Sequence, residues 1–173
     1  ADGRKLLDGV NLELRAGEIV AIAGVAGNGQ QALAELLFGL QALSSGRLEL
    51  QGRAMPARAA DWVRAGVARI PEDRHAVGMV GDLPVWENAV AERLPGPIFS
   101  RAAAGLRWVR RGAARAHAQR IVDIFDVRGA GLDAPAAALS GGNLQKLILG
   151  RALLAPDGSA PQLIVAHQPC WGL

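Results

Sequence analysis

Residues 18–37 read EIVAIAGVAGNGQQALAELL and combine three local patterns in one stretch. Ile19–Ala23 is a short apolar run with β-branched residues, which predicts a buried strand, and the leucines after Gln31 recur at helical spacing. The three glycines between them allow positive φ and close approach of the backbone, so successive N–H groups can point at one anion in front of a helix N-terminus. The stretch therefore predicts a strand, a phosphate-binding loop and a helix.

The spacing of this loop matches G-x-x-x-x-G-K-[ST], with Gly24 as the first glycine and Gly29 as the second. Gln30 then stands where the motif has Lys, and Gln31 stands where it has Ser or Thr. A neutral amide supplies no charge to a phosphate, and it is a poor ligand for Mg²⁺. Two interpretations stay open, a phosphate cradle without its charged residues and a glycine-rich turn that binds nothing.

Composition limits the class of protein. The chain has 173 residues, of which 50% are hydrophobic and 20% charged, as expected for one globular domain with a core. The net charge is only +3, so a nucleic-acid partner is not implied. One cysteine, Cys170, excludes an internal disulfide framework, and no apolar run approaches the roughly 20 residues that span a bilayer. We expect a soluble, cytosolic fragment of a longer polypeptide.

Hydrophobic periodicity outlines the rest of the chain. It predicts strands at 5–14, 47–51, 67–70 and 162–166, and helices at 61–66, 84–94, 101–125 and 139–154. Six arginines lie in the third helix between Arg101 and Arg120. Such a run is typical of a solvated face, and the alternative is contact with an acidic partner or an anionic lipid surface.

The second informative stretch is LSGGNLQKLILGRALL, residues 139–154. Ser140 is a good helix N-cap, and Gly141 and Gly142 leave the backbone N–H groups at the helix start open to a ligand. This predicts a second anion site. Charged or polar residues also follow two buried strands, as Pro71-Glu72-Asp73-Arg74 and as His167-Gln168, where open α/β sheets keep their ligands.

The order of these features resembles the nucleotide-binding domain of an ABC transporter. LSGGNLQK, GVAGNGQ and PEDR are similar to the second, C-terminal domain of tandem ATPase subunits that energise import of simple sugars and nucleosides in bacteria, and AHQPCWGL is most similar to the nucleoside branch. The resemblance implies an α/β P-loop NTPase-like domain with a parallel-sheet core, antiparallel strands and a helical insertion, truncated at the C-terminus. It divides the chain into a core with the degenerate loop (1–83), a helical subdomain (84–138) and a signature part that returns to the core (139–173).

The resemblance also implies where hydrolysis fails. Glu72 stands at the position of the family's Gln that meets Mg²⁺ and water, His167 at that of a magnesium-holding Asp, and Gln168 at that of the general base. A glutamine cannot take a proton from water, so a loss on the order of 10²–10⁴-fold is expected in the chemical step. The resemblance assigns no complete metal site, and any Mg²⁺ would have to use Gln31, Glu72 and His167. Whether this domain, as one half of an ATPase pair, is itself an enzyme stays open. Its binding of ATP and Mg²⁺ is expected to be weak or absent.

The predicted site therefore has two parts. The nucleotide loop comprises Gly24, Gly27, Asn28, Gly29, Gln30 and Gln31, and the signature comprises Ser140, Gly141, Gly142, Asn143 and Gln145. The resemblance implies that the signature closes over ATP held by a partner domain, in a peripheral complex on the cytoplasmic face of the inner membrane. The implied partners are a second nucleotide-binding domain, permease subunits and, indirectly, a solute-binding protein. Slow hydrolysis by this half and a nucleotide-free scaffold docked on the permease remain as alternatives.

Overall fold

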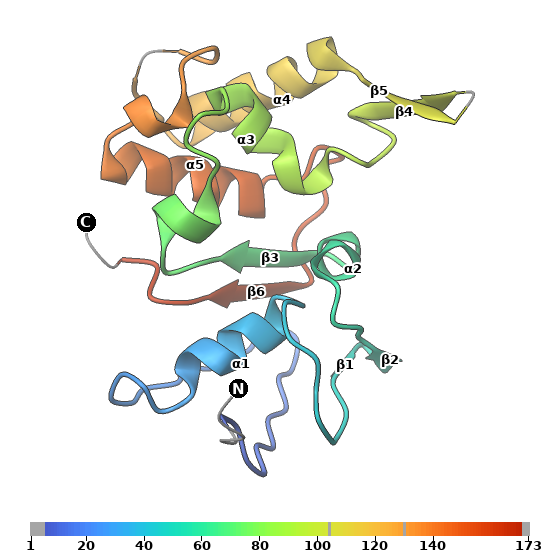
Figure 1. Ribbon diagram of the computed structural model, residues 1–173, viewed down its shortest axis with the longest axis vertical. Coiled ribbons are helices and arrows are strands. Elements are labelled where there is room, and N and C mark those ends of the chain that lie inside the picture. The colour runs from blue at the N-terminus through green and yellow to red at the C-terminus, as the bar shows by residue number, and fades with distance from the viewer. Residues whose placement is uncertain (1–5, 104, 130, 171–173) are drawn as a thin grey trace. The chain divides into compact units, whose positions relative to one another are not determined.

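The computed structural model describes residues 6–103, 105–129 and 131–170, and its elements fall into two compact units (Figure 1). The first unit, Ala1–Ala59, contains α1 (Gln30–Leu37) and a short antiparallel pair of strands, β1 (Glu49–Leu50) and β2 (Arg53–Ala54). The second unit, Ala60–Leu173, contains the parallel strands, the remaining helices and a β-hairpin. Among the described residues, no helix has the length and apolar character that a membrane crossing requires.

In the first unit, α1 confirms the helix expected after the glycine loop. Its apolar positions bury Ala34 and, at the C-cap, Phe38. The β1–β2 pair, with Glu49 opposite Ala54, realises the strand expected at 47–51 in shortened form.

Two predicted strands of the first unit are wrong. Residues 6–14 and Ile19–Ala23 form no strand in the described part of the chain, and Ile19 is 95% exposed. The physical reason is that a strand depends on hydrogen bonds to a neighbouring strand, and none of the described strands pairs with either segment. An apolar run can therefore predict strand character without providing the partner.

The sheet of the second unit consists of β3 (Val67–Ile70) and β6 (Leu163–Ala166), which pair in parallel with Val67 opposite Leu163. Both strands were predicted at these positions. The prediction that β6 is buried is wrong, because alternate residues of β6 are exposed and Ile164 is 53% exposed. Successive side chains of a strand point to opposite faces of the sheet, so this pattern shows that one face of β6 is poorly covered by the described residues.

Three helices build the core of the second unit above this sheet (Figure 1). They are α3 (Val85–Val90), continued by a 3-10 turn at Ala91–Arg93, α4 (Arg111–Ile124) and α5 (Gly141–Leu153), while a shorter helix, α2 (Ala59–Arg64), precedes β3. The apolar face of α5 buries Leu144, Leu147 and Ile148 to 2% exposure or less. This core holds the N-terminus of α5 and the end of β3 in a defined arrangement.

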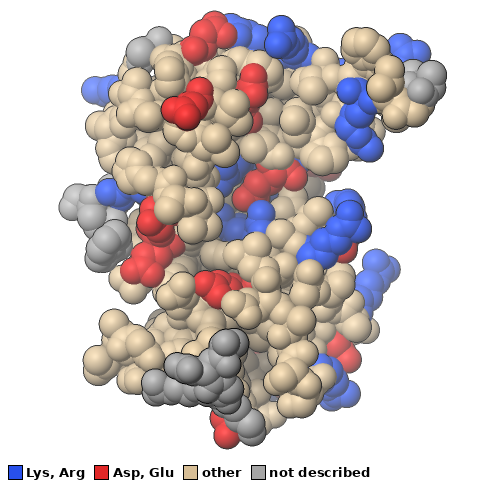
Figure 2. Space-filling view, in the orientation of Figure 1, with Lys and Arg blue, Asp and Glu red and all other residues tan. Residues whose placement is uncertain are grey.

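The arginine-rich segment differs from its prediction. In place of one helix from 101 to 125, Ser100–Ala103 (β4) and Leu106–Val109 (β5) form an antiparallel hairpin, and the helix starts only at Arg111. Gly105, with φ of +75°, supplies the left-handed turn conformation that a helix cannot use. Figure 2 shows basic surface over this hairpin, at the upper right of the view.

Candidate functional site

The glycine loop of the first unit leads directly into α1. Gly27 and Gly29 have φ of +89° and +97°, so both adopt the left-handed conformation, and Gly29 is the N-cap of α1. No side chain caps this helix, and its first N–H groups are available for an acceptor. The backbone thus has the features expected of an anion-binding loop.

Gln30 folds back over this loop. Its amide nitrogen donates to the carbonyl of Val25 at 3.1 Å, and its amide oxygen accepts from the N–H of Asn28 at 3.2 Å. A Cβ added at Gly24 would collide with the Gln30 amide nitrogen, so the folded-back amide occupies the space beside Gly24. The structure therefore brings Gly24, Asn28 and Gln30 together. The Gln30 amide is uncharged, and it occupies the Asn28 N–H that a phosphate could otherwise use.

Gln31 turns away from the loop. Its amide nitrogen donates to Glu35 across one helical turn at 2.8 Å, and Glu35 also accepts from Gln41 at 2.8 Å. Mg²⁺ prefers oxygen ligands in strict octahedral geometry, and the Gln31 side chain is engaged in a helix-surface hydrogen bond instead. At this position the residues present do not fit a magnesium ligand.

In the second unit, the ends of β3 and β6 bring Glu72 and His167 together. The His167 N–H donates to the carbonyl of Ile70 at 2.9 Å, which extends the parallel ladder by one step, and Nδ1 of His167 lies 3.4 Å from Oε2 of Glu72. The carboxylate thus faces an imidazole of its own chain. One carboxylate paired with a histidine does not fit the ligand set that Mg²⁺ and its waters require, so no metal-dependent step is assigned here.

Gln168 follows His167 with φ of +44°, a conformation that costs a residue other than glycine or asparagine some strain. Its side chain is exposed. The amide takes no proton at neutral pH and can only orient a water molecule.

The N-terminus of α5 is capped by the Ser140 side chain. The Ser140 hydroxyl oxygen accepts from Nδ2 of Asn143 at 2.9 Å and from its N–H at 3.5 Å, and Asn143 in turn accepts from the N–H of Arg128 at 2.7 Å. Gly142 is exposed, and no atom lies within 4 Å of the place where its Cβ would be. The helix start is therefore preorganised around Ser140 and open at Gly142.

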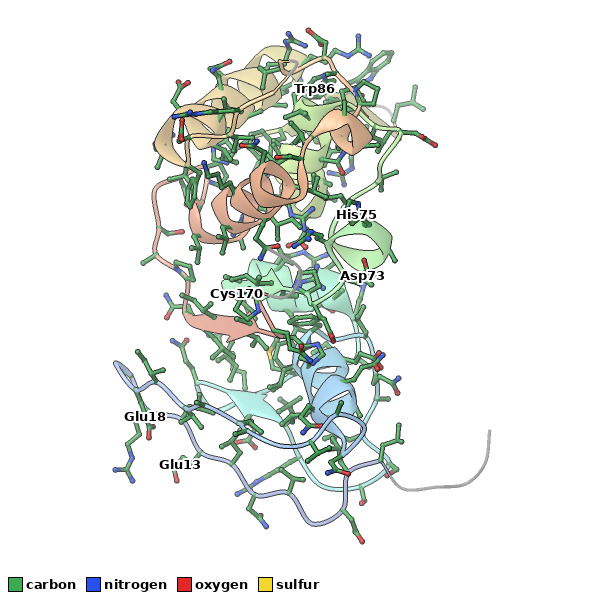
Figure 3. All side chains as sticks on the ribbon, turned by 90° about the vertical axis from the view of Figure 1, so that its left-hand side faces the viewer. Glu13, Glu18, Asp73, His75, Trp86 and Cys170 are labelled. Carbon is green, nitrogen blue, oxygen red and sulfur yellow. The ribbon has the colours of Figure 1, made fainter. Side chains whose placement is uncertain are left out.

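The guanidinium of Arg74, which the sequence places only after a buried strand, lies at the start of α5. Arg74 is the first residue of the π-helical turn Arg74–Gly78, which Asp73 caps by accepting from the N–H groups of His75 and Ala76 at 2.9 and 2.8 Å. These backbone hydrogen bonds, that of Ala76 foremost, lower the pKa of Asp73. Figure 3 shows Asp73 and His75 on this turn. A Cβ built at Gly141 would lie 3.0 Å from Nη2 of Arg74, so the charge is directly beside the signature glycines.

Gln145 does not point toward this opening. It is 4% exposed, and its amide donates to the carbonyl of Pro169 at 2.8 Å. This hydrogen bond joins the first turns of α5 to the segment that follows β6. Unlike Ser140 and Gly142, which lie at the open helix start, Gln145 is a buried residue that holds two segments of the chain together.

The fold is similar to that of a solved ATP-binding cassette. The dimeric structure of a post-hydrolysis state of the ATP-binding cassette MJ0796, bound to ADP and Pi, matches with a TM-score of 0.72 over 97% of this chain and 68% of that chain, at 21% identity. The model of the family described as ABC transporter matches residues 7–159, and the chain belongs to this family.

The curated relatives of the chain are ATP-binding proteins of importers. The glucose import ATP-binding protein TsgD13 of Haloferax volcanii is 42% identical over 99% of this chain, and the nucleoside import ATP-binding protein NupA of Lactococcus lactis subsp. cremoris is 35% identical over 99% of it. The guanosine import ATP-binding protein NupO of Bacillus subtilis is 36% identical over 95%. The chain spans 30% to 32% of the length of these relatives. The predicted family and fold class are thereby confirmed.

Proposed function

We propose that this chain is an ATP-binding domain of an ABC importer for simple sugars or nucleosides. Its relatives include a glucose import and a nucleoside import ATP-binding protein, which supports this substrate range. The partners are then permease subunits, reached from the cytoplasmic side of the membrane, and a solute-binding protein that delivers the solute to them. Placement as the second, C-terminal domain of a tandem subunit belongs to the same proposal.

Within this importer, the chain acts as the non-consensus half of an asymmetric pair. The observation that carries this proposal is the contrast between the signature helix and the residues at the chain's own nucleotide site. The signature helix has a bound cap, open glycines and the Arg74 guanidinium beside Gly141, whereas Gln30 and Gln168 replace charged residues by amides and Glu72 faces His167. This half is therefore suited to complete the partner's site and poorly suited to hydrolyse ATP at its own.

The residues act on the partner's nucleotide by binding and orientation. The N–H groups at the start of α5 and the Ser140 hydroxyl donate to a terminal phosphate, and the helix dipole favours its negative charge. Arg74 adds a full positive charge at the same place, where charge-assisted hydrogen bonds are stronger than neutral ones. A Mg²⁺ ion bound in the partner's site would supply charge neutralisation there, and this chain's signature residues would not be needed to hold it.

A nucleotide-free scaffold is the second candidate, and the folded-back Gln30 favours it. The Gln30 amide accepts from the N–H of Asn28, a donor that a phosphate-binding loop leaves to its ligand, and its bond to the Val25 carbonyl fixes it in this position. In this case the domain transmits motion without binding ATP at its own loop.

Equilibrium binding of Mg-ATP to the full-length protein distinguishes the two candidates. We expect Gln30→Lys to increase affinity at this loop by about tenfold or more, because a charged donor reaches the phosphates. Gln41→Lys adds the same charge outside the loop and serves as the matched control, since Gln41 bonds Glu35. Unchanged binding in Gln30→Lys, with no additional nucleotide per polypeptide, would show that the loop is vestigial and support the scaffold.

A further inference from the structure

The β4–β5 hairpin has two different faces. Antiparallel register places Arg101 opposite Trp108 and Ser100 opposite Val109, and directly opposite residues project from the same face of a hairpin. Arg101, Trp108 and, two residues before it, Leu106 therefore share one face. Ser100, Val109 and Arg107 share the other.

The second of these faces is turned toward the helical core. Ser100 is 5% exposed and its hydroxyl donates to the carbonyl of Leu94. Val109 lines a small pocket together with Trp86 and Leu94, and Arg107 donates to the carbonyl of Pro95. This face is held against the body of the unit, so the orientation of the hairpin is defined.

The first face is consequently presented to solvent. Trp108 is 63% exposed, Leu106 is 60% exposed and Arg101 is exposed. A tryptophan and a leucine beside an arginine are the side chains that sit at a membrane interface, where the apolar groups enter the headgroup region and the cation meets phosphate.

The run of sequence that contains the hairpin carries charged side chains of one sign. Residues 93–122 contain seven arginines and no Asp or Glu. Of these, Arg115 is neutralised by Asp133, whereas Arg107 and Arg110 donate to uncharged carbonyls of Pro95 and Pro97. Figure 2 shows basic surface gathered over the hairpin. The positive charge of the hairpin is therefore available to an external anion.

We propose that the outward face of the β4–β5 hairpin binds an anionic phospholipid surface. Trp108 and Leu106 enter the interfacial region, and Arg101 binds headgroup phosphates, with Arg110 adding to the local positive potential. The contact would orient the helical part of the domain against the cytoplasmic leaflet, independently of nucleotide.

Charge favours lipid over a permease loop as the occupant. Cytoplasmic loops of membrane proteins carry an excess of Lys and Arg, which would repel this arginine-rich hairpin, whereas the cytoplasmic leaflet carries negative surface potential. The inference rests on the proposed function only in placing the protein near a membrane. Lipid binding in solution can fail or succeed without any change in the conclusions about nucleotide.

The test is flotation of the full-length protein with vesicles of phosphatidylcholine alone and of phosphatidylcholine mixed in equal parts with phosphatidylglycerol. We expect binding to the anionic vesicles only, decreasing as salt is raised. Arg101→Gln should weaken it by about fivefold, the effect of one interfacial charge. Trp108→Ala should weaken it by a similar factor. Arg53→Gln, which removes an exposed arginine from β2 in the first unit, is the matched control and should bind as wild type.

A second readout follows Trp108 itself. Trp62 and Trp86 are 2% and 6% exposed, so Trp108 is the exposed tryptophan within the described residues, and its fluorescence should shift to shorter wavelength on anionic vesicles. The shift should be absent from Trp108→Ala. The proposal would be overturned by equal binding to both vesicle types or by no binding to either. It would also be overturned if Arg101→Gln lost assembly with the permease but kept vesicle binding, because the partner would then be an acidic protein surface.

Discussion

At the scale of single residues, His117 shows how burial changes the chemistry of a side chain. It lies on α4, is 5% exposed, and its ring centroid is 5.4 Å from that of Phe99. Desolvation lowers its pKa, and the nearby positive charges of Arg120 and Arg93 lower it further, while a hydrogen bond to the Leu154 backbone opposes the shift. The folded protein therefore favours neutral His117.

This shift predicts a pH dependence of stability. Below the ordinary histidine pKa of 6.5 the unfolded chain binds a proton that the folded chain excludes, so the free energy of unfolding should fall as the pH drops from 7 into the acid range. Urea unfolding at several pH values measures this slope, and His117→Gln should reduce it. His75→Gln removes an exposed histidine and controls for the loss of an imidazole as such. An unchanged slope in His117→Gln would contradict the assignment.

At the scale of elements, Gly150 of α5 packs directly against Ile121 of α4. A Cβ added there would collide with Cγ2 of Ile121 and lie 3.0 Å from the ring of Phe125, and Ile121 is 0% exposed and has no room to move. The small residue is thus a condition for this helix packing.

Gly150→Ala should therefore destabilise the domain. In an open helix the change gains about 0.5–1 kcal/mol, but overpacking a buried contact costs about 1–3 kcal/mol, so the balance is unfavourable. Gly112→Ala in α4 is the matched control, because nothing lies within 4 Å of its Cβ position, and it should be neutral or stabilising. Thermal unfolding of both variants gives the two signs, and a stabilised Gly150→Ala would refute the packing argument.

Two substitutions of Ser140, at the start of α5, distinguish its role as a helix cap from its proposed role in phosphate binding. Ser140→Ala should lower the free energy of unfolding by about 1 kcal/mol through loss of the cap. Ser140→Asp keeps a capping oxygen for Asn143 but places a negative charge where the partner's phosphate is proposed to bind. We expect Ser140→Asp to retain stability and to lose ATP turnover in the full-length protein by tenfold or more. Normal turnover in this variant would exclude phosphate binding at Ser140.

At the scale of the whole molecule, local signals predicted the second unit better than the first. The strands at Val67–Ile70 and Leu163–Ala166 and the capped helix at Ser140 follow from apolar runs and one good capping residue. The failed strand at Ile19–Ala23 carries an equally clear apolar run, but its pairing depends on residues distant in the chain. The hairpin was missed because arginines obscured the alternation of residues 106–109, although Gly105 marked the turn.

The candidate site shows the same division. The sequence places Glu72 and His167 after two apolar strands, and because these strands pair in parallel the two side chains lie 3.4 Å apart. The position of Arg74 beside Gly141 and the hydrogen bond from Gln145 to Pro169 could not be predicted, because both depend on how α5 packs over the ends of β3 and β6. Motifs identify functional residues, whereas tertiary packing decides which of their atoms remain available.

The acid-free run at 93–122 also gives the second unit an electric dipole moment that the net charge of +3 conceals. Of the thirteen basic and ten acidic residues of Ala60–Leu173, seven basic ones lie in this run, which leaves six basic against ten acidic elsewhere in the unit. An approaching anionic surface would therefore attract one side of the unit and repel the rest. Long-range electrostatic forces would therefore turn the hairpin toward the anionic surface before any contact forms, so that orientation precedes binding.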